Sequence, residues 1–140
     1  MMSDEIKNIY QIAKRAMGSQ LVRLNAIASN LANADNIASN PNDAYKPVKP
    51  VFETKFADAL KQSGVSTVDV VGIKEVLRDP EKIYMPGHPE ANDDGYVFRA
   101  SVDENEEMVE MLEASRQYEN NVEVVSTLRG LMMRTISMGK

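Results

Sequence analysis

All six prolines of this 140-residue chain fall between positions 41 and 89. Proline removes a backbone hydrogen-bond donor and disrupts the interior of a helix. Both ends of the chain are therefore free to form long helices, whereas the middle is not. We predict three segments: an N-terminal helical arm at 1–35, a middle domain at 36–101 and a C-terminal helical arm at 102–140.

The N-terminal arm carries one continuous apolar stripe. Its apolar residues recur every three or four positions, which is the spacing of one face of an amphipathic helix. They are Ile6, Tyr10, Ala13, Met17, Leu21, Leu24, Ile27 and Leu31.

The C-terminal arm begins with the acidic run 103–107. Asp103 is placed to cap a helix, with Glu106 three residues later as in a capping box. A divalent-cation site is the alternative, but helix N-termini favour carboxylates without any metal. The stripe that follows is close to a heptad. It comprises Met108, Met111, Ser115, Tyr118, Val122, Val125, Leu128 or Arg129, and Met132.

The middle domain reads as β structure. Residues 46–52 and 67–77 are rich in Val and Ile, although Pro47 and Pro50 restrict the first to an edge position. Asn92 to Gly95 predicts a turn before a short strand at 96–98, and 53–62 is compatible with a short helix. We therefore expect an α+β fold, in which the terminal helices pair as a coiled-coil-like arm beside a small β-rich domain.

Composition argues against an enzyme. The chain has no cysteine, a net charge of −5 and one histidine, His88, in a proline-rich loop. No cofactor or metal site and no nucleic-acid partner is expected. A hydrolase built on Asp93, Asp94 and His88 is the enzymatic alternative. No apolar run is long enough to span a membrane, and the N-terminus does not resemble a cleavable signal peptide.

Two features leave alternatives open. Asn25, Asn30 and Asn33 lie among small residues, either on the surface or at close helix contacts whose register they fix. The methionines of the C-terminal arm form either an adaptable binding face or ordinary packing.

Three stretches resemble the bacterial flagellar axial proteins of the rod and hook. Residues 24–34, with the core Ser29-Asn30-Leu31-Ala32-Asn33, resemble their N-terminal signature. Residues 107–124 resemble the C-terminal helix of rod proteins. Residues 84–97, with Ser101-Val102-Asp103, resemble the middle of a proximal rod component. Together these stretches span nearly the whole chain in the same order.

The resemblance implies a structural subunit of the flagellar basal-body rod. Its terminal helices would self-assemble into the tubular drive shaft that surrounds the export channel and transmits torque. The implied partners are other copies of the chain, neighbouring rod proteins and the flagellar type III export apparatus. Export to the periplasm-spanning rod would then need no cleavable signal peptide. A helical adaptor that binds one partner without polymerising is the rival interpretation.

We expect the assembly interface to lie on both arms, with the apolar side chains packing between helices and subunits and the asparagines setting register. The arms carry opposite net charges, +1 for 1–35 and −4 for 103–140, which favours their pairing. The expected residues are Leu21, Leu24, Ile27, Asn30, Leu31 and Asn33, with Met111, Tyr118, Val122, Val125 and Met132.

Overall fold

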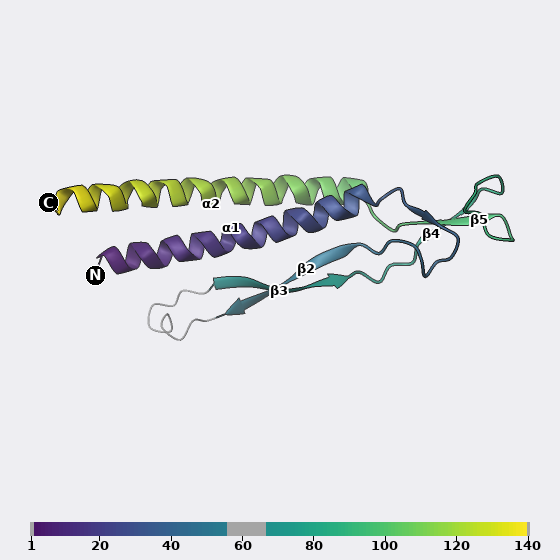
Figure 1. The fold of residues 1–140 in the computed structure, drawn as a ribbon, viewed down its shortest axis with the longest axis horizontal. Coiled ribbons are helices and arrows are strands. Elements are labelled where there is room, and N and C mark those ends of the chain that lie inside the picture. Colours follow the sequence, from purple (N-terminus) through teal and green to yellow (C-terminus); the bar gives the residue numbers. More distant parts are fainter. Residues whose placement is uncertain (1, 56–66, 140) are drawn as a thin grey trace.

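The computed structural model, which describes residues 2–55 and 67–139, is a long thin molecule (Figure 1). Helix α1 (Met2–Ala32) and helix α2 (Glu104–Met138) lie side by side and run in opposite directions. Both chain ends therefore lie at one end of the molecule, and a small sheet forms the tip at the other. The predicted α+β fold, with a long helix at each end and small antiparallel sheets in the middle, is confirmed, whereas coiled-coil packing of the two helices stays a prediction.

Helix α2 begins where the sequence predicts. Asp103 is its N-cap, and the Oδ1 atom accepts hydrogen bonds from the backbone N–H groups of Asn105 at 3.0 Å and Glu106 at 3.2 Å. The carboxylate of Glu106 is engaged elsewhere, by Lys49 at 3.3 Å and Arg78 at 3.5 Å. Glu106 thus ties α2 to the middle domain, a long-range role that the expected capping box did not include.

Strands β2 (Val48–Lys55) and β3 (Thr67–Glu75) form an antiparallel pair with an irregularity between Val51 and Phe52. The pair packs against α1, where the Ser19 hydroxyl donates to the Val68 carbonyl at 3.1 Å. Both strands were expected. The helix predicted at 53–62 is wrong for residues 53–55, which extend β2, and its remainder lies outside the described residues.

The tip is a separate three-stranded antiparallel sheet in the order β1-β5-β4. Its strands are β1 (Ile37–Ala38), β4 (Glu81–Tyr84) and β5 (Tyr96–Arg99). Val97 on β5 is fully buried and forms the centre of this small unit. The strand at 96–98 was predicted, whereas the short β1 and β4 were not.

The β4–β5 loop is held by its own polar groups. The Asn92 side-chain oxygen accepts hydrogen bonds from the N–H groups of Asp94 at 3.1 Å and Tyr96 at 2.8 Å. His88 accepts a hydrogen bond at Nδ1 from the Glu90 N–H at 3.0 Å. Asn92 to Gly95 is therefore the predicted turn, and His88 helps to shape the loop.

We expect Gly95→Ala to destabilise the tip by about 1–3 kcal/mol. Gly95 has φ +81°, and an added Cβ would lie 3.0 Å from Tyr84 Cε2 and 3.1 Å from Pro86 Cβ. Urea unfolding followed by circular dichroism measures the effect. Gly87→Ala is the matched control, because its Cβ would meet nothing within 4 Å. Equal losses for the two variants would contradict the strain argument.

The core is made largely of small side chains, which allows the elements to approach closely. Helix α2 contributes little to it: among its described residues only Glu107, Ala114 and Leu128 are buried. Most of this 35-residue helix is therefore left in contact with solvent. No helix in the described part of the chain is long and apolar enough to cross a membrane.

Candidate assembly interface

Asn30 joins three elements of the fold. Its side chain is 1% exposed, and Oδ1 accepts hydrogen bonds from the Val48 N–H at 2.8 Å and the Tyr45 hydroxyl at 3.0 Å. Nδ2 donates to the Val48 carbonyl at 3.0 Å, and the amide also donates to the Glu107 carboxylate. All four hydrogen-bonding positions of the amide are used. Asn30 thus links α1 to β2 and to α2.

The neighbouring residues of the asparagine motif complete the end of α1. The Ser29 hydroxyl lies 3.0 Å from the Tyr45 hydroxyl. The Asn33 amide donates to the Ser29 carbonyl at 2.8 Å and accepts from the Asn36 amide at 2.6 Å. Asn25 is exposed. The motif therefore fixes contacts within the chain, and Asn30 and Asn33 carry most of them.

Glu107 lies beside Asn30 and is 4% exposed. Burial raises the pKa of its carboxyl group, while the hydrogen bond from Asn30 acts in the opposite direction. Its Oε2 atom is buried and accepts no hydrogen bond from the described residues. A carboxylate held in this way lowers the stability of the fold unless it is protonated or finds another partner.

We expect Glu107→Gln to be more stable than the parent chain at pH 7. The folded-state pKa of Glu107 is raised, so ionising this group is disfavoured in the folded state and the cost is full above that pKa. The advantage of glutamine should therefore shrink as the pH falls toward 4.5, the ordinary value for glutamate. Thermal unfolding between pH 4 and 8 tests this, with the exposed Glu119→Gln as control. A variant that is less stable at pH 7 would contradict it.

A network of ion pairs surrounds the region where Asn30 links α1 to β2 and α2. Lys49 on β2 lies 3.1 Å from Glu110 and 3.3 Å from Glu106. Burial lowers the pKa of Lys49, but hydrogen bonds to Glu110 and Glu106 outweigh it, so the net shift is upward. Arg23 on α1 lies 3.6 Å from Glu113 and 3.9 Å from Glu110. These pairs are partly exposed, so each contributes only about 0–1 kcal/mol.

The predicted interface residues divide between the interior and the surface. Ile27 and Asn30 are buried inside the chain. Leu21 and Val122 are exposed, at 45% and 42%. The others are partly buried: Leu24, Leu31, Asn33, Met111, Tyr118, Val125 and Met132. The partly buried residues leave some surface for further contacts, and their role between subunits stays a prediction.

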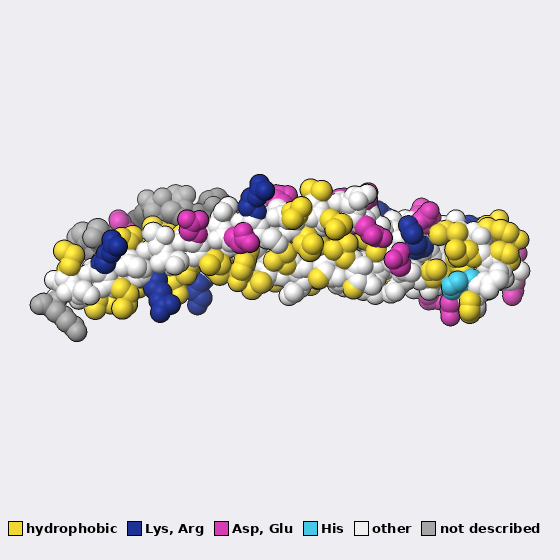
Figure 2. All heavy atoms as spheres, turned by 90° about the horizontal axis from the view of Figure 1, so that it is seen from above, with side chains coloured by type: hydrophobic (Ala, Val, Ile, Leu, Met, Phe, Trp, Pro, Cys, Tyr) yellow, Lys and Arg dark blue, Asp and Glu magenta, His cyan; other side chains and the backbone are white. Residues whose placement is uncertain are grey.

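Other apolar residues of α2 are more exposed than those we predicted. Leu112 is 68% exposed and Val109 64%, and Met108 beside them is 53% exposed. Their spacing of three and four residues places them together on the helix surface. Exposed apolar residues continue towards the C-terminus at Val124, Leu131, Met133 and Ile136. Figure 2, viewed from above the helices, shows apolar side chains along the molecule.

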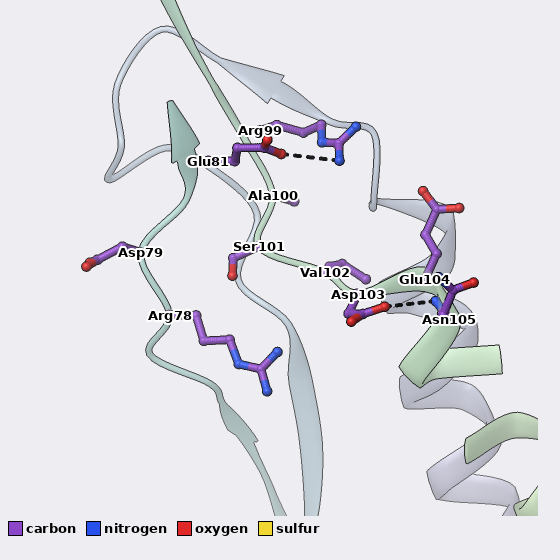
Figure 3. A pocket seen from close by; sticks show the side chains of 10 residues that line it. All are labelled: Arg78, Asp79, Glu81, Arg99, Ala100, Ser101, Val102, Asp103, Glu104 and Asn105. Atoms are coloured by element: carbon purple, nitrogen blue, oxygen red, sulfur yellow. Dashed lines mark hydrogen bonds and ion pairs between the residues drawn. The ribbon is translucent and has the colours of Figure 1, made fainter. Parts of the chain in front are cut away.

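An open hollow of about 530 Å³ lies where the tip meets the start of α2 (Figure 3). Its two cations are paired: Arg99 lies 3.2 Å from Glu81, and Arg78 reaches Glu106. Asp79 points away from the others in Figure 3. No group of three potential metal-ligating side chains occurs in residues 2–55 and 67–139. The hollow is thus a charged joint between tip and body.

Known proteins resemble this chain over almost its full length. Residues 94–138 match the family described as flagellar basal body rod FlgEFG protein C-terminal. The chain is 39% identical to the flagellar basal-body rod protein FlgC of Escherichia coli O6:H1, covering 95% of this chain and 97% of that protein. The chain belongs to the FlgC family of flagellar basal-body rod proteins. FlgC of Salmonella typhimurium is 38% identical over 95% of the chain, and FlgC of Bacillus subtilis 30% identical over 92%.

Membership of the FlgC family makes this chain a structural component of the flagellar basal body and not an enzyme. The resemblance drawn from the asparagine motif, the tip loop and the C-terminal helix is confirmed. Sequence reasoning missed the contribution of Glu107, Val109 and Leu112. The predicted apolar stripe followed one line of positions along α2, and Val109 and Leu112 lie beside that line.

Proposed function

We propose that the chain is a proximal rod subunit that self-assembles through its terminal helices into the drive shaft around the export channel, transmitting torque. The observation that carries this proposal is the exposed apolar surface of α2, centred on Val109 and Leu112. Apolar burial is worth roughly 25 cal/mol per Å². A helix that is packed on α1 along one side still has this surface available for coiled-coil-like contacts with neighbouring subunits.

The proposed partners are other copies of the chain, neighbouring rod proteins and the flagellar type III export apparatus. The slender shape supports this, because α1 and α2 extend well beyond the compact tip (Figure 1). Export would precede assembly and would not depend on a cleavable signal. In the exported subunit the helical arms would order fully only on packing, since isolated helices are marginally stable.

Deleting the gene in its source organism and imaging the envelope by electron cryotomography tests the proposal. We expect the basal ring to remain while the rod, hook and filament are missing, and the intact gene to restore them. A deletion strain that builds complete flagella would overturn the rod assignment. An adaptor that binds one partner would then be the remaining interpretation.

A further inference from the structure

A small pocket lies where α1, α2 and β2 meet. It has a volume of about 200 Å³, and its walls include Ala26, Ile27, Val48, Pro50 and Phe52. Phe52 is 41% exposed and stands at the solvent side, whereas Ile27 is 2% exposed and lies deep. Apolar walls of this size suit one long side chain with an aliphatic stem.

The charged residues that line the pocket are two cations, Arg23 and Lys49, and two carboxylates, Glu107 and Glu110, but the wider ion-pair network has more carboxylates than cations. The ion-pair network around it contains three cations, Arg23, Lys49 and Arg78, which pair with Glu106, Glu110 and Glu113. Glu107, which also lines the pocket, is a fourth carboxylate. With all groups ionised the network is one positive charge short of neutrality.

The geometry of Glu107 itself points to a missing partner. Its side chain is almost fully buried, and its Oε2 atom accepts no hydrogen bond from the described residues. Buried carboxylate oxygens are normally bonded, because an unbonded one has lost its solvation without replacement. The pocket therefore combines an apolar channel with an unsatisfied acceptor at its wall.

We infer that this pocket receives a lysine or arginine side chain from a neighbouring rod subunit, which brings its cationic head to Glu107. The inference rests on the proposed function, since it needs a neighbouring subunit. The methylene stem would lie between Phe52 and Ile27, and the head would supply the missing positive charge. Such a contact is satisfied only in the assembled rod.

Lys49 is positioned to admit the incoming side chain. Its stem lines the pocket, while its Nζ atom is held by Glu106 and Glu110 at the partly exposed rim. Ion pairs at such positions are weak enough to rearrange. If the Lys49 head moved aside, both rim carboxylates would keep a cation, because Glu106 also pairs with Arg78 at 3.5 Å and Glu110 with Arg23 at 3.9 Å. Burial raises the pKa of the Glu107 carboxyl group more than Asn30 and Lys49 lower it, so these neighbours do not fully compensate the buried charge.

The test measures competition for places in the rod. Cells express the parent chain and a Glu107→Gln variant at equal levels, each with a distinguishable tag, and their ratio is measured in purified basal bodies. We expect the Glu107→Gln variant to be under-represented about tenfold, because glutamine has no negative charge to pair with the incoming lysine or arginine. Glu119→Gln, which removes an exposed charge from the same helix, measures the effect of charge loss alone. Equal incorporation of the Glu107→Gln and Glu119→Gln variants would overturn the inference.

A second pair of variants keeps the test independent of Glu107 folding effects. Phe52→Lys places a cation of the chain's own at the mouth of the pocket, whereas Phe52→Leu keeps the wall apolar. We expect Phe52→Lys to be under-represented about tenfold relative to Phe52→Leu, because its side chain competes for Glu107. Equal incorporation of the two would contradict an incoming cation.

The outcomes separate the two proposals. If the parent chain itself is absent from purified basal bodies, the proposed function fails. No neighbouring rod subunit would then exist to supply a side chain to the pocket. If the parent chain is present, and Glu107→Gln and Phe52→Lys are each incorporated as well as their controls Glu119→Gln and Phe52→Leu, only the pocket inference fails.

Discussion

Replacing Asn30 with leucine should lower the free energy of unfolding by about 3 kcal/mol, because leucine has a similar size but no polar atoms. The Val48 N–H and the Val48 carbonyl would each lose the hydrogen bond they now make with the Asn30 amide. The Tyr45 hydroxyl would lose an acceptor, and Glu107 a donor. Each buried group left unbonded costs about 1–3 kcal/mol, partly offset by the apolar burial of leucine.

Urea unfolding monitored by circular dichroism at 222 nm measures this loss, because both helices meet the middle domain at Asn30. Asn25→Leu is the matched control: Asn25 is exposed on the same helix, and its replacement should change stability by less than about 0.5 kcal/mol. A similar small change for Asn30→Leu would show that the junction contributes little to the fold.

Asn30→Asp separates shape from hydrogen bonding at the same position. Aspartate can still accept from Val48 N and Tyr45, but when ionised it cannot donate to the Val48 carbonyl or to Glu107. It also places a second carboxylate beside the first. We therefore expect a loss at pH 7 that is partly recovered as the pH falls and either carboxyl group becomes protonated.

The contrast between Asn30 and Asn25 shows what the sequence could supply. The motif drew attention to the asparagines among small residues. It did not decide whether each asparagine lies on the surface or at a close contact between elements. Deciding between them required knowing that Val48, eighteen residues away, presents its backbone to Asn30. Such a pairing depends on how the chain folds back on itself, which local periodicity does not encode.

The middle domain shows a similar division. Runs of Val and Ile predicted both strands of the β2–β3 pair, because residues of this type fit a pleated surface. The helix expected at 53–62 failed at its start, where Glu53 and Thr54 pair with Asp69 and Val68 on β3. Pairing with a neighbouring strand outweighed the weak local preference for a helix. Strand β1 is two residues long and leaves no periodic signal to detect.

The apolar pattern of α2 predicted a helix correctly but described its faces incompletely. The partly buried Met111, Tyr118 and Val125 lie on the expected stripe, as does the buried Leu128. Met108, also on that stripe, is 53% exposed. A pattern along one helix cannot distinguish a side that packs within the chain from a side that packs against another subunit. Contacts with α1, such as Gln20 to Gln117 at 2.8 Å, settle which side is internal.

Leu112→Glu should abolish rod assembly while leaving the single chain folded. Leu112 is 68% exposed on α2, and glutamate is a good helix former, so stability should change by less than about 0.5 kcal/mol. In the assembled rod the same position would place an unpaired carboxylate against an apolar neighbour, which costs several kcal/mol at each subunit contact. Because a rod repeats the contact, the loss should prevent assembly altogether.

Two measurements on the Leu112→Glu variant test this prediction. Circular dichroism of the purified variant checks the fold, and electron cryotomography of cells that express it in place of the parent chain checks for rods. Leu112→Met is the control, since it keeps an apolar side chain of similar volume and should support normal rods. Leu24 and Val125 are poorer choices, because both are partly buried and a charge there would also disturb the single chain. Normal rods in the Leu112→Glu strain would mean that the exposed side of α2 faces solvent in the basal body, and the interface would then have to lie elsewhere on the molecule.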